Sequence, residues 1–326
     1  MTNLNNFVGI DISKEFFDIY FEYCGQPLSM RLSNNSKGFK LLLKKLSVAN
    51  YCVMEATGPY YLPLACFLVG NGIKVSVVNP LVIKRYSQMR MIRTKTDKAD
   101  ARMIMEYASQ NELNLWEAPQ KYMIELQQLE ALSDIHTKTR TALTNQLKAF
   151  QASGMMDEQT GSFITAELEH LDDKLKMLEN RMLTLTKEYH GEMFNNLTSI
   201  PGLGKKTAIG LIVLSGGFKK FENYRQLSSY IGLCPRVFES GKTVKGKGRI
   251  CKIGMSRIRA MLYMCTLSAK KTNLSCKNLY ERLVAKGKPK MVALIAIANK
   301  LIKQAFAIGV RGIKYDPNYN VEKSIS

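Results

Sequence analysis

Four acidic residues in the first third of the chain are placed where they could hold a divalent metal ion. Asp11 lies inside the apolar segment VGIDIS, and Glu55 lies near the end of the apolar segment YCVMEA. Asp97 and Asp100 begin a segment with helical periodicity, and residues three apart are neighbours on one helix face. An acid within a strand is disfavoured and costs free energy when it is buried without a partner. The four acids are therefore candidates for one functional cluster.

A cluster of this kind has a specific chemistry. Carboxylates that converge on one point repel each other, and their pKa values rise unless a cation is present. An all-oxygen ligand set favours Mg²⁺ or Mn²⁺ over zinc. Two such ions about 4 Å apart hold the attacking and leaving oxygens of a phosphodiester displacement. The alternative is that Asp97 and Asp100 only stabilise a first helical turn. The acids within strand segments favour the metal site.

A second set of candidate residues surrounds the sequence PGLG at residues 201–204. Gly202 and Gly204 let backbone amides approach a phosphate, and the helix predicted after them presents its N-terminus to the anion. Lys205 and Lys206 add positive charge at the same place. The pattern resembles a helix-hairpin-helix element, which grips the nucleic-acid backbone without reading sequence. An ordinary turn between two helices is the alternative.

Residues 232–262 contain many basic residues and a single acid, Glu239, which suits a track of phosphate contacts. The candidates in that track are Arg236, Lys242, Lys245, Lys247, Arg249 and Lys252. Ser240 lies among them. Its neighbours alone predict a hydrogen bond to a phosphate, because no histidine lies nearby in sequence to activate the hydroxyl as a nucleophile.

Composition points to the same class of partner. The 326 residues carry a formal net charge of +20, which predicts binding to nucleic acid or to an anionic membrane surface. No apolar run approaches the roughly 20 residues of a membrane span, and no signal peptide is apparent. Nucleic acid is therefore the expected partner, with no membrane. Seven scattered cysteines without CxxC spacing predict reduced thiols and a cytoplasmic protein.

The predicted elements would bring the acids together. Three strands are expected in residues 7–32, then strands near 51–56 and 73–80 that alternate with helices, and a helix opened by Thr96 and Asp97. This order predicts an α/β sheet with both pairing directions. Beyond residues 116–121, helical patterns dominate.

The most regular of these patterns is a heptad seam. Its members are Leu168, Leu171, Leu175, Leu178, Met182, Leu185 and Tyr189. Three heptads are too few to decide between a helical hairpin that packs on itself and a coiled coil between two chains. Both alternatives remain open from the sequence.

The order GIDISK, EATGPY, NP and KTDKADARM resembles the insertion-sequence transposases with an Asp-Glu-Asp-Asp tetrad, the family numbered one hundred and ten, known as bridge-RNA-guided recombinases. The resemblance implies an RNase H-like (RuvC-like) α/β domain over residues 1–118 that binds metal through Asp11, Glu55, Asp97 and Asp100. It further implies a helical coiled-coil segment over residues 119–192. The expected last part, residues 193–326, is a mainly α transposase domain with a helix-hairpin-helix.

The same resemblance changes the expectation for Ser240. In an ESG context matching residues 239–241, a serine of these transposases attacks DNA and becomes covalently linked to it. A noncoding RNA would choose the element ends and the target DNA by base pairing. Strand exchange would need a dimer that pairs into a tetramer, in the bacterial cytoplasm at the nucleoid.

Two other functions fit part of the pattern. A metal-dependent junction resolvase or nuclease would have the tetrad without serine chemistry and would release free DNA ends. A non-catalytic nucleic-acid-binding protein would show no Mg²⁺ dependence and no loss on Asp11→Asn. The charge fits all three functions, and only the tetrad argues for an enzyme.

Overall fold

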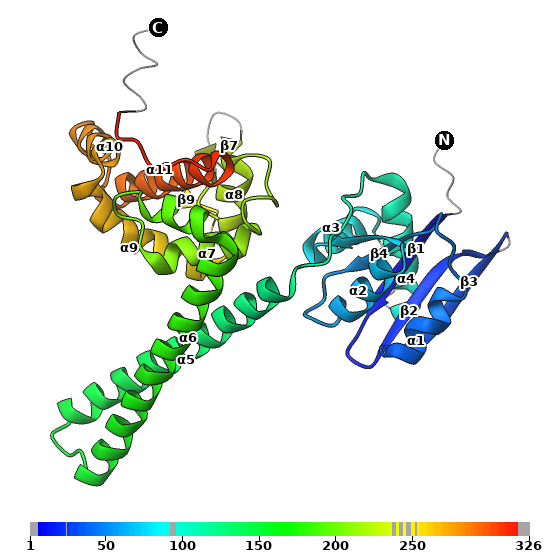
Figure 1. Ribbon diagram of the computed structural model, residues 1–326, viewed down its shortest axis with the longest axis horizontal. Helices are drawn as coiled ribbons and strands as arrows, with labels where there is room; N and C mark the ends of the chain where they lie inside the picture. The colour runs from blue at the N-terminus through cyan, green and yellow to red at the C-terminus, as the bar shows by residue number, and fades with distance from the viewer. Residues whose placement is uncertain are drawn as a thin grey trace, which may run out of the picture. The chain divides into compact units, whose positions relative to one another are not determined.

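The structure is a computed structural model that describes residues 6–23, 25–91, 96–236, 239–240, 244–245, 249–251 and 253–318. The chain divides into two compact units, Met1–Pro119 and Gln120–Ser326. Each unit has a hydrophobic core of its own. Figure 1 shows the first unit in blue to cyan.

A mixed five-stranded sheet forms the centre of the first unit. Its strands are β1 (Phe7–Ile12), β2 (Phe16–Tyr23), β3 (Gln26–Ser33), β4 (Tyr51–Glu55) and β5 (Lys74–Val78), in the order β3-β2-β1-β4-β5. The β1–β2 and β2–β3 pairs are antiparallel, whereas β1–β4 and β4–β5 are parallel. Both pairing directions were predicted, because a meander is followed by strands that alternate with helices. This RNase H-like α/β architecture confirms the predicted fold class.

Helices cover both faces of this sheet. They are α1 (Ser36–Leu43), α2 (Leu62–Gly70), α3 (Pro80–Met89) and α4 (Asp97–Gln110). Ile10 of β1 packs in the core with α1 and α2, whereas Val53 of β4 packs with α3 and α4 on the other face. Thr96 caps α4 by accepting a hydrogen bond from the backbone N–H of Ala99, as its sequence predicts.

Gly9 explains how α4 comes so close to β1. A Cβ atom on Gly9 would lie 2.0 Å from the backbone oxygen of Ala101 and 2.5 Å from the backbone nitrogen of Met105. Only glycine leaves room for this contact. Gly9 and Asp11 point to the same face because side chains alternate along a strand. The close packing therefore places the first turns of α4 beside Asp11.

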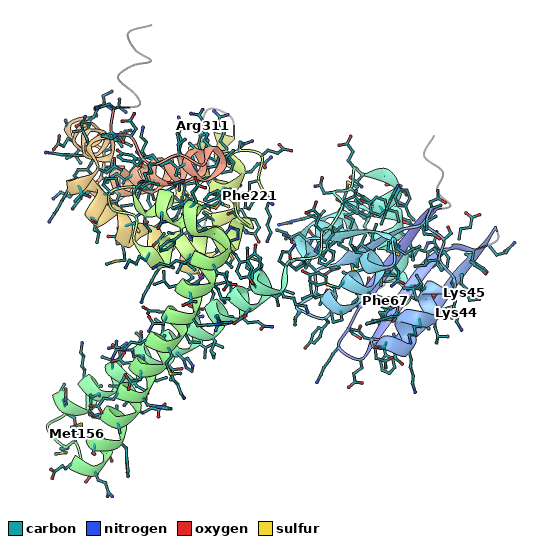
Figure 2. The ribbon with its side chains drawn as sticks, in the orientation of Figure 1. Lys44, Lys45, Phe67, Met156, Phe221 and Arg311 are labelled. Atoms are coloured by element: carbon teal, nitrogen blue, oxygen red, sulfur yellow. The ribbon has the colours of Figure 1, made fainter. Side chains whose placement is uncertain are left out.

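The second unit begins with two long helices, α5 (Lys121–Ala152) and α6 (Glu158–Thr198), which form an antiparallel hairpin (Figure 1). Leu171, Met182 and Leu185 of the heptad seam are buried. The hairpin alternative is thus present within one chain. From residue 127 to residue 160, all of them described, no side chain is buried. Figure 2 labels Met156 near the hairpin tip.

The rest of the second unit is mainly helical, which confirms the predicted class. Its elements are α7 (Lys205–Ser215), α8 (Tyr224–Ile231), β6 (Pro235–Arg236), β7 (Glu239–Ser240), β8 (Val244–Lys245), β9 (Arg249–Ile250), α9 (Ser256–Thr272), α10 (Leu274–Ala285) and α11 (Lys290–Arg311). Leu211, Leu262 and Leu301 are fully buried and join α7, α9 and α11 in one core.

Helix α11 differs from one expectation. The sequence predicted no segment long and apolar enough for a membrane span, yet α11 has 22 residues and reaches a mean hydropathy of 1.6 in its most apolar window. Lys300 and Lys303 lie within the helix and interrupt its apolar sequence, so that the continuous apolar run appeared too short. Half of that window is buried inside the unit, and Ala293, Ile297, Leu301 and Ile308 lie in the core. The apolar face of α11 therefore serves the packing of this domain.

Candidate metal centre and nucleic-acid contacts

The central strands place Asp11 and Glu55 at the same end of the sheet. β1 and β4 run parallel, and Ile10 lies directly beside Met54, so that Asp11 and Glu55 each follow a paired residue. Because parallel strands end at the same edge, their last side chains share that edge. Thr57 donates a weak hydrogen bond of 3.4 Å to Glu55 just beyond the strand.

The charges around Asp11 show that the acids converge. The pKa of the Asp11 carboxyl is raised to about 6, first by burial and then by the nearby carboxylates of Asp100, Glu55, Asp97 and Asp18, in that order. Each of these anions disfavours the ionised form of Asp11. The structure therefore brings the four predicted acids into one neighbourhood, together with a fifth acid.

The donor set of this neighbourhood suits a hard divalent cation. All the acids offer carboxylate oxygens, and a dication would relieve the repulsion that raises the Asp11 pKa. Among the described residues, however, no three acid, histidine or cysteine side chains lie close enough together to hold a metal ion. The residues fit Mg²⁺ or Mn²⁺ by charge and chemistry, and at least one carboxylate must move to complete the ligand set.

Two further residues of this site escaped the sequence analysis. Asp18 of β2 lies directly opposite Asp11, and Arg31 of β3 lies directly opposite Asp18. Asp18 is buried and accepts three hydrogen bonds of 2.9 to 3.2 Å from Arg31. Arg31 also pairs with Asp97 at the start of α4. The sequence offered the same signal for Asp18 and Arg31 as for Asp11, because each is a charged residue within a predicted strand.

The raised pKa of Asp11 gives a testable pH dependence. Because its folded pKa of about 6 exceeds the ordinary 3.8, protonation favours the folded state. This contribution is complete below pH 4 and is lost as the pH rises through about 6. It amounts to at most about 3 kcal/mol at about 1.36 kcal/mol per pKa unit. Urea unfolding in EDTA should therefore show a smaller loss of stability between pH 5 and pH 8 in Asp11→Asn than in wild type. Equal losses of stability in the variant and in wild type would contradict the raised pKa of Asp11.

The PGLG turn lies between α6 and α7, as predicted. Gly202 has a positive φ of 94°, and a Cβ atom there would lie 2.6 to 2.7 Å from Ala269 of α9. Asn273, fully buried, donates through its side-chain amide to the backbone oxygen of Pro201 at 3.4 Å. The turn is therefore held against α9. Gly204 is the N-cap of α7 and is open to solvent.

The two lysines after the turn differ. Lys205 is exposed at the first position of α7 and is placed to meet an anion. Lys206 is paired with Glu179 of α6. Lys206 would have to leave that ion pair to contact a phosphate.

The two glycines of the turn make a matched pair of variants. Gly202→Ala should lower the free energy of unfolding by about 2 to 4 kcal/mol, since it adds both backbone strain and a clash with α9. Gly204→Ala should cost about 0.5 kcal/mol or less, because its φ is −77° and nothing lies within 4 Å of the added Cβ. Chemical denaturation measures both. Equal effects would show that the turn is not fixed as described.

The predicted phosphate track is described only in part. Lys242, Lys247 and Lys252 lie outside the described residues. Arg236 pairs with Arg249 between β6 and β9, and Ser240 pairs with Val244 between β7 and β8. Lys245 lies in β8 as well. The structure describes only the backbone of these residues and not the side chains of Arg236, Ser240, Lys245 and Arg249.

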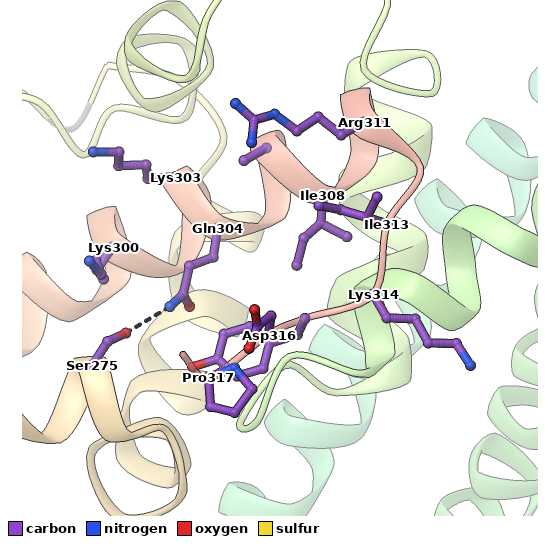
Figure 3. Close-up of a pocket in the computed structure, with 12 residues that line it drawn as sticks. Ser275, Lys300, Lys303, Gln304, Ile308, Arg311, Ile313, Lys314, Asp316 and Pro317 are labelled. Carbon is purple, nitrogen blue, oxygen red and sulfur yellow. Dashed lines mark hydrogen bonds between the residues drawn. The ribbon is translucent and has the colours of Figure 1, made fainter. Parts of the chain in front are cut away.

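A basic cavity that the sequence analysis missed lies beside α11. It has a volume of 130 Å³ and is lined on one side by Lys300, Lys303 and Arg311 of α11. The segment after α11 lines the other side with Ile313, Tyr315 and Asp316, and Figure 3 shows the Lys314 side chain pointing away from α11. A hydrogen bond of 2.8 Å from Gln304 to Ser275 spans one end. Helical spacing could have revealed this stripe of cations, which adds to the positive surface of the second unit.

Two family models match different parts of the chain. The family model for DEDD transposases of the IS110 type matches residues 8–153, which include the four acids. The model described as "Transposase IS116/IS110/IS902 family" matches residues 194–281, which include the PGLG turn and Ser240. The DEDD domain implies a divalent metal.

Similar curated proteins cover almost the whole chain. The pilin gene-inverting proteins of Moraxella bovis and Moraxella lacunata are each 29% identical to it, over 93% of this chain and 95% of their own length. The transposase for insertion sequence element IS1111A of Coxiella burnetii is 26% identical, over 90% of this chain and 86% of its own. The chain therefore belongs to the IS110/IS1111 family of transposases, with an RNase H-like DEDD domain followed by a helical transposase domain.

Proposed function

We propose that this transposase cleaves and rejoins DNA at a composite site made of the acidic tetrad and Ser240. The observation that carries the proposal is the group of carboxylates around Asp11, whose pKa they raise. Acids gathered at one edge of a sheet persist only where another part of the structure or a ligand compensates their repulsion. A divalent cation is the ligand that suits them.

In this proposal Asp11, Glu55, Asp97 and Asp100 hold Mg²⁺ or Mn²⁺. The bound ions would supply Lewis acidity at a phosphodiester. Asp11 is the most constrained ligand, since β1 and the close packing of α4 on Gly9 fix its position. Asp97 lies at the first turn of α4 and is well exposed, so it is the ligand best able to adjust.

Ser240 is proposed as the nucleophile. Its Oγ would attack a DNA phosphorus, lose its proton to a nearby base or water, and form a phosphoserine link. The leaving sugar oxygen would take up a proton. The bond energy is kept in the phosphoserine, so the reverse attack by a sugar hydroxyl of another strand rejoins DNA without an external energy source. The support is the ESG context of the resemblance, within the matched transposase region.

The positive charge of the chain supports nucleic acids as its partners. A net charge of +20, the exposed Lys205 and the cations beside α11 suit contacts to phosphates. DNA is the substrate of a transposase. The family resemblance supports guidance by a noncoding RNA, and the guided reaction would take place in the bacterial cytoplasm, at the nucleoid.

Two outcomes of strand exchange are possible for such a site. The relatives named as transposases favour movement of an insertion element. The relatives named as pilin gene-inverting proteins favour inversion of a DNA segment. Both outcomes use the same cleavage and joining steps, and the arrangement of the recombination sites decides between them.

We further propose that the α5–α6 hairpin joins two copies of the chain, which would then pair into a tetramer. Ile135, Phe163 and Met177 on this hairpin are exposed, and no side chain from residue 127 to residue 160 is buried. Exposed large apolar side chains on a long hairpin favour association with a second hairpin.

Ile135→Ser with Phe163→Ser should lower the mass seen by light scattering to that of a monomer. Gln146→Ser, an exposed polar control on α5, should leave it unchanged. A dimer that survives the double change would place the contact elsewhere.

The experiment that tests the proposed function is a strand-cleavage assay. The full chain, its co-expressed RNA and labelled DNA from the element ends are incubated with Mg²⁺ or with EDTA. Cleavage should need Mg²⁺ and should disappear in Asp97→Asn and Asp100→Asn. Asp173→Asn, an exposed acid of α6, is the matched control and should cleave normally. Nucleic-acid binding without any metal-dependent cleavage would favour the non-catalytic alternative.

A further inference from the structure

One arginine takes the place of a counter-ion within the acidic cluster. Arg31 lies opposite Asp18 in the β2–β3 pairing and donates to both of its carboxylate oxygens at 2.9 to 3.2 Å. The same Nη2 atom donates to Asp97 at the start of α4. Arg31 therefore links a buried acid beside Asp11 to one of the proposed metal ligands.

The two ends of this bridge are not equivalent. The Asp18 side chain is 12% exposed and is held by three hydrogen bonds from the guanidinium. The Asp97 side chain is 61% exposed and receives one. Breaking the buried bidentate contact would leave the Asp18 carboxylate charged and unpaired inside the sheet. Water can replace the exposed contact between Arg31 and Asp97. Asp18 is thus the anchor, and Asp97 is the partner that can be exchanged.

The position of Asp97 conflicts with a complete metal site. In the described part of the chain no three acids lie close enough to hold a metal, and Asp97 is engaged by Arg31. A dication near Asp97 would also be repelled by the guanidinium, because like charges a few ångströms apart interact strongly. Binding the metal and keeping the Arg31–Asp97 pair therefore oppose each other.

We propose that Arg31, anchored by Asp18, is a built-in counter-cation that holds Asp97 in the metal-free protein and competes with the divalent metal for its carboxylate. The inference rests on the proposed metal site. Arg31 would set the metal concentration at which the site becomes complete. It neutralises part of the acidic cluster when the ion is absent, and its ion pair with Asp97 weakens the apparent affinity for the ion.

Calorimetric titration of the full chain with Mn²⁺, without nucleic acid, tests this role. Arg31→Gln should lower the Mn²⁺ dissociation constant about fivefold, the upper end expected when one exposed ion pair no longer has to be broken. Arg102→Gln is the matched control, since Arg102 lies on α4 and pairs with Glu106 at 2.8 Å. It should leave the constant unchanged. Equal or weaker Mn²⁺ binding in Arg31→Gln would overturn the proposal, as would the same gain in the control.

A second pair of variants removes the effect of leaving Asp18 without its partner. Asp18→Asn is compared with Asp18→Asn/Arg31→Gln. Because residue 18 is uncharged in both, loss of Arg31 leaves no buried charge unpaired. Loss of Arg31 should again tighten Mn²⁺ binding, and no change would overturn the proposal.

The metal site itself is tested separately. If wild type shows no saturable Mn²⁺ binding that Asp97→Asn removes, the proposed function fails. If that binding exists but is indifferent to Arg31, only this inference fails.

Discussion

Asp11→Asn is expected to reduce Mg²⁺-dependent DNA cleavage by about a thousandfold while making the metal-free protein more resistant to heat above pH 7. Cleavage should fall because Asp11 is a proposed metal ligand, and the loss of such a ligand removes several kcal/mol of transition-state stabilisation. Thermal resistance rises because the variant lacks the negative charge that burial disfavours most, followed by Asp100, Glu55, Asp97 and Asp18. Cleavage gels and thermal unfolding in EDTA measure the two effects.

The opposite directions of these effects make the prediction specific. A mutation that merely damaged the fold would lower both activity and stability. Asp173→Asn serves as the control, because Asp173 is 74% exposed and pairs only locally with Lys176. It should change neither quantity appreciably. An Asp11→Asn variant that melts at a lower temperature in EDTA would show that Asp11 is a structural acid and would remove the main argument for the metal centre.

Ser240→Ala is expected to abolish both covalent linkage to DNA and strand exchange, by at least about a thousandfold, while DNA affinity and Mn²⁺ binding remain unchanged. The alanine lacks the hydroxyl oxygen that would form the phosphoserine. Denaturing gels detect the linkage, and anisotropy with labelled DNA measures affinity.

The matched control for this variant is Ser229→Ala, which removes an exposed hydroxyl from α8. It should retain both linkage and exchange. If Ser240→Ala still cleaved DNA and released free ends, the tetrad would act as a nuclease with water as the nucleophile. Ser240 would then be a phosphate contact, as its neighbours alone predict.

The sequence predicted the acidic cluster because each member carries a local signal. Asp11 and Glu55 interrupt apolar strand segments, and Asp97 and Asp100 follow a helix cap at Thr96. The parallel pairing of β1 with β4 then requires Asp11 and Glu55 to share one edge. Strand alternation and edge geometry were enough to expect these acids near each other.

The Asp18–Arg31 bridge could not be predicted in the same way. Which residues lie opposite each other across β1, β2 and β3 depends on the register, and the register is fixed by packing in three dimensions. The role of Gly9 is also a property of the packed structure, since only the approach of α4 makes its missing side chain necessary. Sequence patterns give the elements, whereas contacts between elements set the charges around Asp11.

The helical hairpin illustrates a different limit. The heptad seam was visible, but a repeat of that length is satisfied equally by a helix of the same chain or of another chain. In the structure α6 packs on α5, and Tyr189 stacks on Tyr122 with ring centroids 3.9 Å apart. The exposed Ile135 and Phe163 nevertheless leave apolar surface for a second copy.

The most direct test of the composite site is the identity of the residue that becomes attached to DNA. The full chain is incubated with Mg²⁺, its RNA and DNA from the element ends, then digested with nuclease and protease and examined by mass spectrometry. The account predicts a nucleotide attached through phosphate to Ser240, formed with Mg²⁺ and absent in EDTA and in Asp97→Asn. Cleaved DNA with free ends and no modified peptide, or a nucleotide attached to another residue, would contradict it.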